Sequence, residues 1–237
     1  MLSKNEIKYI QSLFHKKNRD AENAFIVEGA KAVNELLHSG FTVANVYAVE
    51  EWIEETGNKA VLLTSDELKK ISGQVTPNQV LAVAQQKSVS SLPSFKNKII
   101  LALDGIQDPG NMGTIIRTAD WFGIENIIAS NDTADFYNPK VIQATMGSFT
   151  RVNVYYDDLD KLLANAGVPV FGAVMNGSDI FIQPKIKEGI IVIGNEGNGI
   201  RNNILPLIQH PITIPRQGNA ESLNAAVAAA IIISHLV

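Results

Sequence analysis

IILALDGIQDPGNMGTIIRTADWFG, residues 99–123, is the stretch of sequence that decides the fold. It opens with an uninterrupted apolar run from Ile99 to Leu103, reaches Asp104, and crosses a loop with two glycines and one proline. A helical pattern then runs from about Met112 to Phe122. A fully apolar strand followed by a helix is typical of a parallel sheet covered on both faces. Ligands bind such sheets in the loops after the carboxyl ends of the strands, so the loop after Asp104 is a candidate site.

The rest of the second half repeats this alternation of apolar strands and helices. Further strands are predicted at 127–129, 152–155, 170–173, 190–193 and 212–214. Helices are predicted at 140–147, 159–166, near 200–209, and from Ser222 to the end of the sequence. We therefore expect residues 97–237 to form an α/β domain around a parallel sheet.

The first half predicts a second, smaller α/β unit over residues 1–86. Helices are expected at 3–17, 29–37 and 66–71, and strands at 25–27, 43–49, 60–63 and 80–84. Ser3 and Glu6 have the spacing of a capping box at the start of the first helix. The polar, serine-rich stretch 87–96 is predicted to be an interdomain linker, with a surface loop as the alternative.

Composition excludes several classes of protein. The sequence contains no cysteine, which rules out disulfides and thiolate zinc sites, and its four histidines are scattered. No metal site is therefore expected. The N-terminus lacks the features of a signal peptide. The longest apolar run, residues 225–237, is shorter than the roughly 20 residues that span a bilayer. We expect a cytoplasmic protein without a membrane segment.

The net charge of −4 argues mildly against nucleic-acid binding, but the charge is unevenly distributed. Six basic residues lie within the first 31 positions: Lys4, Lys8, Lys16, Lys17, Arg19 and Lys31. Composition alone favours a solvated helix surface, and a local face that meets phosphates is the alternative.

The first candidate motif follows the strand that ends at Asp104. Asn111 is placed at the predicted N-cap of the next helix, and Arg117 lies among apolar residues of that helix. An ordinary ion pair of Arg117 with Asp104 or Asp120 is the commoner explanation of such an arginine. A functional role is the alternative.

The second motif is IGNEGNGI, residues 193–200, directly after a buried strand. Its glycines do not spell GxGxxG, no Lys-Ser/Thr pair follows, and the HPITIP region downstream lacks the acid of a Rossmann fold. A loop whose exposed backbone binds a polar ligand is favoured over a tight turn. Glu196 provides one carboxylate inside it.

The third motif is IPRQGNAESLNAAVAAAI, residues 214–231. Ser222 fits the ordinary role of a helix cap, whereas Asn224, two residues later and next to apolar positions, fits it less well. The helix that follows is apolar nearly all round. It must therefore be enclosed or packed against a partner.

Together the three motifs, whose first reads NMGTIIRTADWFG over 111–123, resemble the SpoU/TrmH family of the SPOUT methyltransferase superfamily in content, order and spacing. The resemblance covers residues 97–237. More loosely, residues 19–37 resemble that family's substrate-binding domain, which is similar to ribosomal-protein-type RNA-binding folds. The resemblance implies an α/β domain with a C-terminal trefoil knot, a small N-terminal α/β RNA-binding domain, and a homodimer with the active site near the subunit interface.

The resemblance also implies S-adenosyl-L-methionine as cofactor and a ribose 2′-hydroxyl of structured RNA, rRNA or tRNA, as methyl acceptor, with no metal. The implied cofactor contacts are Gly194, Ile214 and Leu223, together with Asn195 and Gly199. The implied catalytic residues are Arg117, Asn111, Glu196, Ser222 and Asn224.

Arg117 corresponds to the family's catalytic arginine, although arginine is effectively always protonated. It would then act as a cation that grips phosphate and stabilises an alkoxide. Glu196 would orient Arg117 or act as the base instead. Asn111, Ser222 and Asn224 would place the ribose and its phosphate.

The second half is itself acidic, so RNA contact must depend on local basic groups. These are expected to be Arg117, Arg151, Arg201, Arg216 and the N-terminal lysines. Two other functions stay open at this point: a SPOUT enzyme that methylates a base, and a non-catalytic RNA-binding or ribosome-assembly protein with the same fold.

Overall fold

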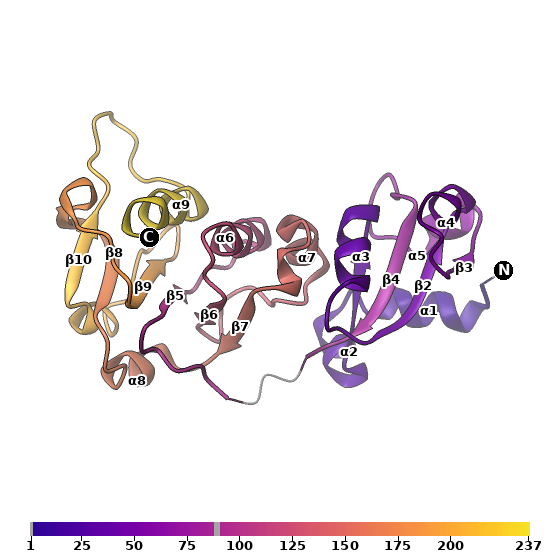
Figure 1. Cartoon of the computed structure of the whole chain (residues 1–237), viewed down its shortest axis with the longest axis horizontal. Helices are drawn as coiled ribbons and strands as arrows, with labels where there is room; N and C mark the ends of the chain where they lie inside the picture. The colour runs from indigo at the N-terminus through magenta and orange to yellow at the C-terminus, as the bar shows by residue number, and fades with distance from the viewer. Residues whose placement is uncertain (1, 88–90) are drawn as a thin grey trace. The chain divides into compact units, whose positions relative to one another are not determined.

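A computed structural model of the chain describes residues 2–87 and 91–237. Figure 1 shows the course of the chain. It divides into two compact units, one made of Met1–Ser88 with Asp135–Thr150, the other of Val89–Ala134 with Arg151–Val237. Of the predicted linker 87–96, residues 88–90 lie outside the described residues.

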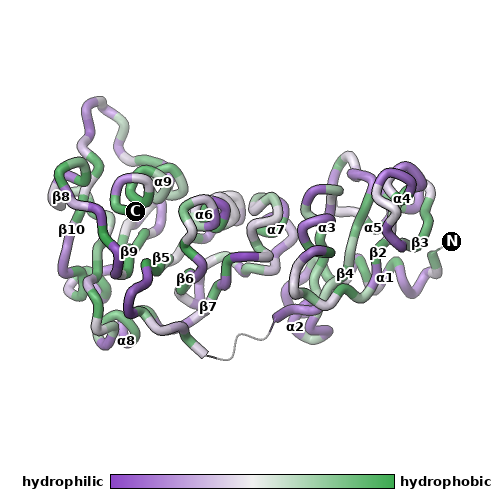
Figure 2. Tube along the Cα trace, in the orientation of Figure 1, coloured by the Kyte–Doolittle hydropathy of each residue, from purple (hydrophilic) through white to green (hydrophobic). Residues whose placement is uncertain are grey.

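The second unit contains a six-stranded sheet whose neighbouring strands all pair in parallel. In spatial order the strands are β10 (His210–Thr213), β8 (Val170–Asp179), β9 (Gly189–Gly194), β5 (Ile99–Asp104), β6 (Asn126–Ala129) and β7 (Asn153–Tyr156). The prediction of a parallel α/β sheet is confirmed. β9 is strongly hydrophobic along its length, as expected for a strand buried on both faces (Figure 2).

The order of the strands places the switch in winding direction beside β5. β6 pairs with one edge of β5, and β9, which comes much later in the sequence, pairs with the other. Ligands of open α/β sheets bind outside the carboxyl ends of the strands at such a switch point. The loops after Asp104 and Gly194 meet there, because these two residues are register partners.

The helices of the second unit are α6 (Pro109–Trp121), α8 (Leu159–Ala164) and α9 (Ala225–Leu236), with 3-10 turns η2 (Ile180–Ile182) and η3 (Leu205–Leu207). The predicted helix near 200–209 is wrong, because only η3 forms there. Pro206 lacks the backbone N–H that a continuing helix would need. The predicted final helix begins at Ala225 rather than at Ser222.

The first unit contains a four-stranded sheet in which β4 pairs antiparallel with both of its neighbours. The strand order is β1 (Ala24–Glu28), β4 (Val80–Gln85), β2 (Val43–Ala48) and β3 (Val61–Leu62). The helices are α1 (Lys4–Ser12), α2 (Lys16–Glu22), α3 (Ala30–Leu37), α4 (Glu50–Thr56), α5 (Ser65–Ile71) and α7 (Pro139–Thr145), followed by η1 (Ser148–Thr150). The sequence analysis missed α4 altogether.

The single helix predicted over 3–17 is two helices, with a break at residues 13–15. The capping box of Ser3 and Glu6 does form. At the break, Arg19 donates from Nη1 to the carbonyl oxygens of Leu13 and Phe14, at 3.0 Å each. Arg19 thereby satisfies carbonyls that no longer have helical partners.

Residues 135–150 belong to the first unit, although the sequence places them between two strands of the second. Arg19 is 2% exposed and its Nη2 lies 2.5 Å from Asp135 Oδ2. Tyr137 packs against Phe25 of β1 in a tilted arrangement and Phe149 packs edge-to-face, with ring centroids 4.6 and 6.1 Å away. A buried ion pair and an aromatic cluster therefore hold this segment on the first sheet.

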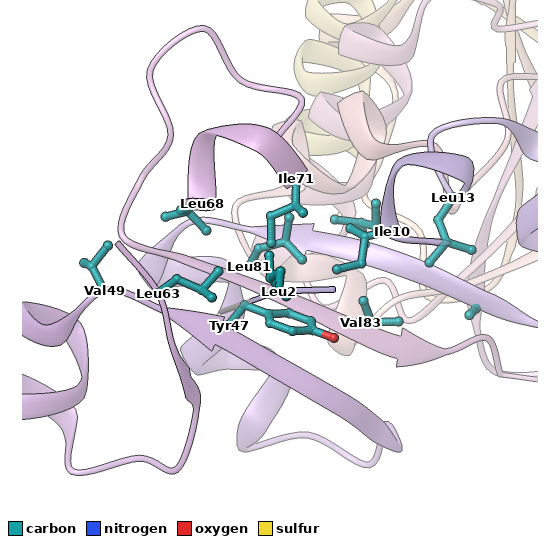
Figure 3. Close-up of a cluster of buried hydrophobic side chains, with 12 residues drawn as sticks. Leu2, Ile10, Leu13, Tyr47, Val49, Leu63, Leu68, Ile71, Leu81 and Val83 are labelled. Atoms are coloured by element: carbon teal, nitrogen blue, oxygen red, sulfur yellow. The ribbon is translucent and has the colours of Figure 1, made fainter. Parts of the chain in front are cut away.

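One face of the first sheet is covered by α1 and α5. Figure 3 shows side chains of both helices converging on Tyr47, Leu81 and Val83 of the sheet. Ile10 and Ile71 are completely buried there. Each such side chain contributes about 2 kcal/mol of burial free energy, which fixes the two helices on the sheet.

Candidate active site

The site is built around the end of β5. Asp104 is completely buried, and its carboxylate accepts from the backbone N–H of Arg201 at 2.8 Å and from Arg201 Nε at 2.5 Å. Arg201 Nη2 also contacts the same carboxylate. A buried carboxylate needs such charged and polar partners, because desolvation otherwise disfavours its ionised form. The pair ties the end of the glycine-rich loop to the end of β5.

The glycine-rich loop 194–200 is closed on itself. Asn195 and Gly199 exchange two backbone hydrogen bonds of 2.9 and 3.0 Å. The Asn195 side chain accepts from Gly197 N and donates to the carbonyl of Gly105, at 2.9 and 2.7 Å. A Cβ on Gly194 would lie 2.3 Å from the carbonyl carbon of Gly199, so the turn requires glycine at 194. The loop is thus held in one conformation by its own hydrogen bonds.

The start of α6 differs from the prediction. Asp108, not Asn111, is the N-cap, and its Oδ1 accepts from Asn111 N at 2.8 Å. Pro109 at the first helical position favours this start, because proline cannot donate there. The helix begins three residues earlier than expected. As a consequence the Asn111 side chain is released from capping, and its Nδ2 donates to Glu196 Oε1 at 2.5 Å.

The start of α9 also differs. Asn224, not Ser222, is the N-cap, and its Oδ1 accepts from the backbone N–H groups of Ala226 and Val227 at 3.0 and 3.2 Å. Ser222 is exposed, and among the described residues its side chain has no hydrogen bond. The prediction assigned the cap to the wrong residue because serine and asparagine are both good caps.

A chain of side-chain amides joins the three motifs. Since Asn224 Oδ1 accepts from the helix, its Nδ2 is the donor to Asn111 Oδ1, at 2.8 Å. Asn111 therefore presents its own Nδ2 to Glu196, a carboxylate that can only accept when ionised. The direction of every bond is fixed by the backbone of α9. Residues separated by 85 and 113 positions in the sequence are brought together in this way.

Arg117 lies on the exposed side of α6, and among the described residues it has no hydrogen bond or salt bridge. The predicted ion pairs of Arg117 are wrong. Asp104 binds Arg201, and Asp120 accepts from Arg151 Nε and Nη2 at 3.0 and 2.9 Å. Glu196 contacts Asn111 rather than Arg117. The guanidinium of Arg117 is therefore available to a ligand.

The remaining predicted cofactor contacts lie around the same sheet edge. Ile214 directly follows β10 and is half-buried, and Gly194 ends β9. Parallel strands bring their carboxyl ends to one edge. Leu223 immediately precedes the cap residue of α9 and is 46% exposed. Exposed loop backbone and an exposed leucine suit a ligand with an adenine ring and polar ends, such as S-adenosylmethionine.

Sequence reasoning missed the supporting residues of this site. Besides Asp104, these are Ser130 and Asp132, whose side chains are 2.7 Å apart. Ser130 Oγ also accepts from Gly105 N at 2.9 Å, and Arg201 Nη1 lies 3.5 Å from Asp132. The hydrogen bond from Ser130 holds the pKa of Asp132 below its ordinary value. An acid at the end of an apolar strand was the one signal that pointed to Asp104.

The expected RNA-contacting arginines fall into two groups. Arg151 and Arg201 have carboxylate partners, so their charge is largely compensated. Arg216 donates to the carbonyl of Ala220 at 3.3 Å, and a neutral carbonyl leaves the positive charge of Arg216 uncompensated. The charge of Arg117 is uncompensated as well. Within the described ranges, no group of three or more His, Cys, Asp or Glu side chains could hold a metal ion. Nor is any described helix long and apolar enough to cross a membrane.

Comparison with known proteins identifies the family. The SpoU rRNA methylase family matches residues 98–234, and an MRM3-like substrate-binding domain matches residues 4–82. The chain is 34% identical to the 23S rRNA (guanosine(2553)-2′-O)-methyltransferase RlmP of Bacillus subtilis, over 98% of this chain and 95% of that protein.

Two solved structures agree over the whole chain. A TrmH-family protein from Porphyromonas gingivalis shares 36% identity at a TM-score of 0.88, covering 100% of this chain and 98% of that one. An AdoMet-bound rRNA methyltransferase from Sinorhizobium meliloti shares 29% identity at a TM-score of 0.87, covering 100% and 95%. The resemblance inferred from the three motifs is confirmed, and the chain belongs to the SpoU rRNA methylase family.

Proposed function

We propose that this protein transfers the methyl group of S-adenosyl-L-methionine to a ribose 2′-hydroxyl in rRNA or tRNA. The observation that carries the proposal is the amide chain from Glu196 through Asn111 to Asn224, together with Arg117, which lies six residues after Asn111 on the same helix and has no side-chain partner among the described residues. Relatives that share 34% and 30% identity with this chain are named as 23S rRNA guanosine 2′-O-methyltransferases. S-adenosylmethionine supplies an electrophilic methyl group when bound, so the chain itself has only to align the acceptor and manage its proton and charge.

We propose that Gly194, Asn195 and Gly199 meet the cofactor through the backbone of the closed loop, with Ile214 and Leu223 beside it. The loop is already hydrogen-bonded at both ends before any ligand arrives. A preformed loop loses little conformational freedom on binding, which favours affinity.

Arg117 acts in this proposal as a fixed cation. It contacts the acceptor phosphate and stabilises the negative charge that develops on the ribose oxygen. Arginine side chains stay protonated in proteins, so Arg117 is not the base in this proposal. Glu196 is the candidate base, because it is the one carboxylate in the amide chain. Asn111 and Asn224 hold it in position, and Ser222 is free to contact the ribose or its phosphate.

The test combines transfer with nucleoside analysis. The protein is incubated with radiolabelled S-adenosylmethionine and either total rRNA or total tRNA, and the digested RNA is analysed by mass spectrometry. A 2′-O-methylated nucleoside is expected. A base-methylated nucleoside would contradict the proposed acceptor. Arg117→Ala should abolish transfer while S-adenosylmethionine binding, measured by calorimetry, stays near that of the wild type; wild-type turnover in this variant would refute the role of Arg117.

A homodimer and a knotted C-terminus complete the proposal. Trp121 is 84% exposed one helical turn after Arg117 on α6, and Val227 on α9 is 48% exposed, so each of these helices presents a large apolar side chain at its surface. Such a surface supports a subunit interface next to the site. The end of α9 is held by the segment before β9, since Ile186 N donates to Leu236 O at 2.7 Å, which is compatible with a threaded chain end.

The domain division at residue 86 and a cytoplasmic location are part of the same proposal. Light scattering of the purified protein tests the dimer. A monomeric mass at micromolar concentration would contradict it.

A further inference from the structure

The C-terminal ends of α1 and α5 lie together on the first unit. Gln11 Nε2 donates to the carbonyl of Lys70 at 2.7 Å, which joins the last turn of α1 to that of α5. A Cβ added to Gly73, just after α5, would lie 2.4 Å from the ring of Phe14, just after α1. The two helix ends therefore form one continuous surface.

This surface carries lysines that no carboxylate neutralises. The apolar sides of α1 and α5 face the sheet, as Figure 3 shows for Ile10 and Ile71. Four exposed lysines lie on these helices or beside them, and we call them the basic end: Lys69 and Lys70 in the last turn of α5, Lys8 in the middle of α1, and Lys17 in the first turn of α2. Among the described residues, none of the four is within 4.0 Å of a carboxylate oxygen.

The acidic groups of the same helices are already occupied at the other ends. Glu6 and Glu67 close the capping boxes of α1 and α5, where they accept from the backbone N–H of Ser3 and Thr64 at 2.8 and 3.0 Å. Carboxylates at helix N-termini are compensated by the helix dipole. At the C-terminal end of α5 the carboxylate of Glu28 accepts from Ser72 Oγ and from Gly73 N, whereas Lys69 and Lys70 of the last turn have no carboxylate partner among the described residues.

A different helix of the same unit has the opposite character. α4 carries four exposed glutamates, and no described basic side chain forms a salt bridge with any of them: Glu50, Glu51, Glu54 and Glu55. Clustered negative charge repels a phosphate backbone. The net charge of −4 hides this contrast between α4 and the basic end.

Two of the basic residues that the sequence analysis grouped with these lysines are committed elsewhere. Arg19 is buried against Asp135, and Lys16 lies 3.2 and 3.6 Å from Asp20 and Asp135. Their charge holds the segment 135–150 on the first unit. Lys69 and Lys70, far from them in the sequence, join the surface instead.

We propose that the basic end of α1 and α5 is the surface through which the first unit holds the phosphate backbone of the RNA substrate, and that α4 faces away from the RNA. The inference rests on the proposed function and names the part of the substrate-binding unit that makes the contact. Lysines act here as point charges that release counterions from the RNA, so the contact is independent of sequence.

The experiment compares matched charge variants of the full-length protein. One variant changes Lys8, Lys17, Lys69 and Lys70 to Gln, and a second changes the same four to Arg. The control changes Glu50, Glu51, Glu54 and Glu55 to Gln. Binding of total rRNA is measured by filter retention from roughly 50 to 200 mM NaCl. Thermal denaturation confirms that each variant is folded, and equilibrium dialysis measures S-adenosylmethionine binding.

The Lys→Gln variant should bind RNA about tenfold more weakly near 0.1 M salt, and the slope of log Kd against log salt should fall by about 3. The Lys→Arg variant should keep the wild-type slope, and the α4 control should not lose affinity. Unchanged affinity and slope in the Lys→Gln variant would overturn the inference, as would an equal loss in the α4 control. If the wild type shows the expected salt-dependent binding but transfers no methyl group, the basic end stands and the proposed function fails.

Discussion

The two loops that contain the proposed cofactor and ribose contacts are built in opposite ways. The loop 194–200 is closed by paired backbone hydrogen bonds and tied to β5 through Asn195 and Arg201. Residues 216–223 before α9 are all exposed, and a single bond from Arg216 to Ala220 is recorded within them. Hydrogen bonds within the protein fix the loop 194–200, whereas residues 216–223 have few such bonds until the chain reaches the helix cap at Asn224. Under the proposed function, the closed loop would offer the cofactor a fixed backbone, and residues 216–223 would be arranged by the ligands that they contact.

Asp104→Asn should give the largest effect, because it removes the buried charge that holds the closed loop. The backbone N–H and the guanidinium of Arg201 bond to different oxygens of the Asp104 carboxylate, and asparagine keeps only one acceptor oxygen and no charge. Breaking a buried ion pair costs about 3 kcal/mol, at the low end of its usual range here because Arg201 is 43% exposed. Urea denaturation measures the loss. S-adenosylmethionine affinity should fall as well; an unchanged stability would show that the pair does not hold the loop.

Gly194→Ala tests the closed loop sterically. The new methyl group would meet the backbone of Gly199 and Ile200 at 2.3 and 2.4 Å, which neither side can relieve by rotating a side chain. We expect a loss of about 2 kcal/mol in the free energy of unfolding and weaker cofactor binding. Gly218→Ala is the control, because Gly218 lies in the exposed loop 216–223, which we call the open loop, and a Cβ there would meet nothing within 4 Å. Equal losses in both variants would erase the proposed distinction between the loops.

Asn224→Ala tests the point at which the open loop becomes ordered. The variant removes the cap of α9 and the donor to Asn111, so about 1 kcal/mol of stability should be lost. The rate of methyl transfer should fall by more than the loss of folded protein explains, because Asn111 loses the hydrogen bond that orients its side chain toward Glu196. Asn224→Asp restores the cap but not the donor. If Asn224→Asp has wild-type turnover, the amide chain is not required for transfer.

Ser222→Ala should have the smallest effect on folding. Its side chain is exposed and has no hydrogen bond in the described structure, so a change within about 0.5 kcal/mol is expected. A selective loss of RNA methylation at wild-type stability would support a ribose contact. A loss of stability near 1 kcal/mol would instead show that Ser222 caps the helix in solution.

The sequence by itself determined the architecture of the second unit and the family that its three motifs resemble. Apolar strands such as 99–103 and 190–193 alternate with helices at local spacing, and local periodicity is a property of consecutive residues. For Arg117 the sequence left both an ion pair and a functional role open, and only the structure removed the ion pairs, since Asp104 and Asp120 bind other arginines. The errors at Asp108 and Asn224 are errors of helix ends, where several polar residues compete for one capping position. The helix predicted near 200–209 is a different error, because only the 3-10 turn η3 forms there.

Tertiary structure alone decided which side chains meet. Asp104 and Arg201 are 97 positions apart, and Asn111 and Asn224 are 113 apart, so no local pattern records either pair. The parallel register of β5 and β9 brings Asp104 and Arg201 together. The capping of α9 by Asn224 orients its side-chain amide toward Asn111. Likewise, residues 135–150 belong to the first unit because Asp135 pairs with Arg19, and Tyr137 and Phe149 pack against Phe25. Periodicity fixes which elements form, while the packing of elements distant in sequence selects the partners that make the site.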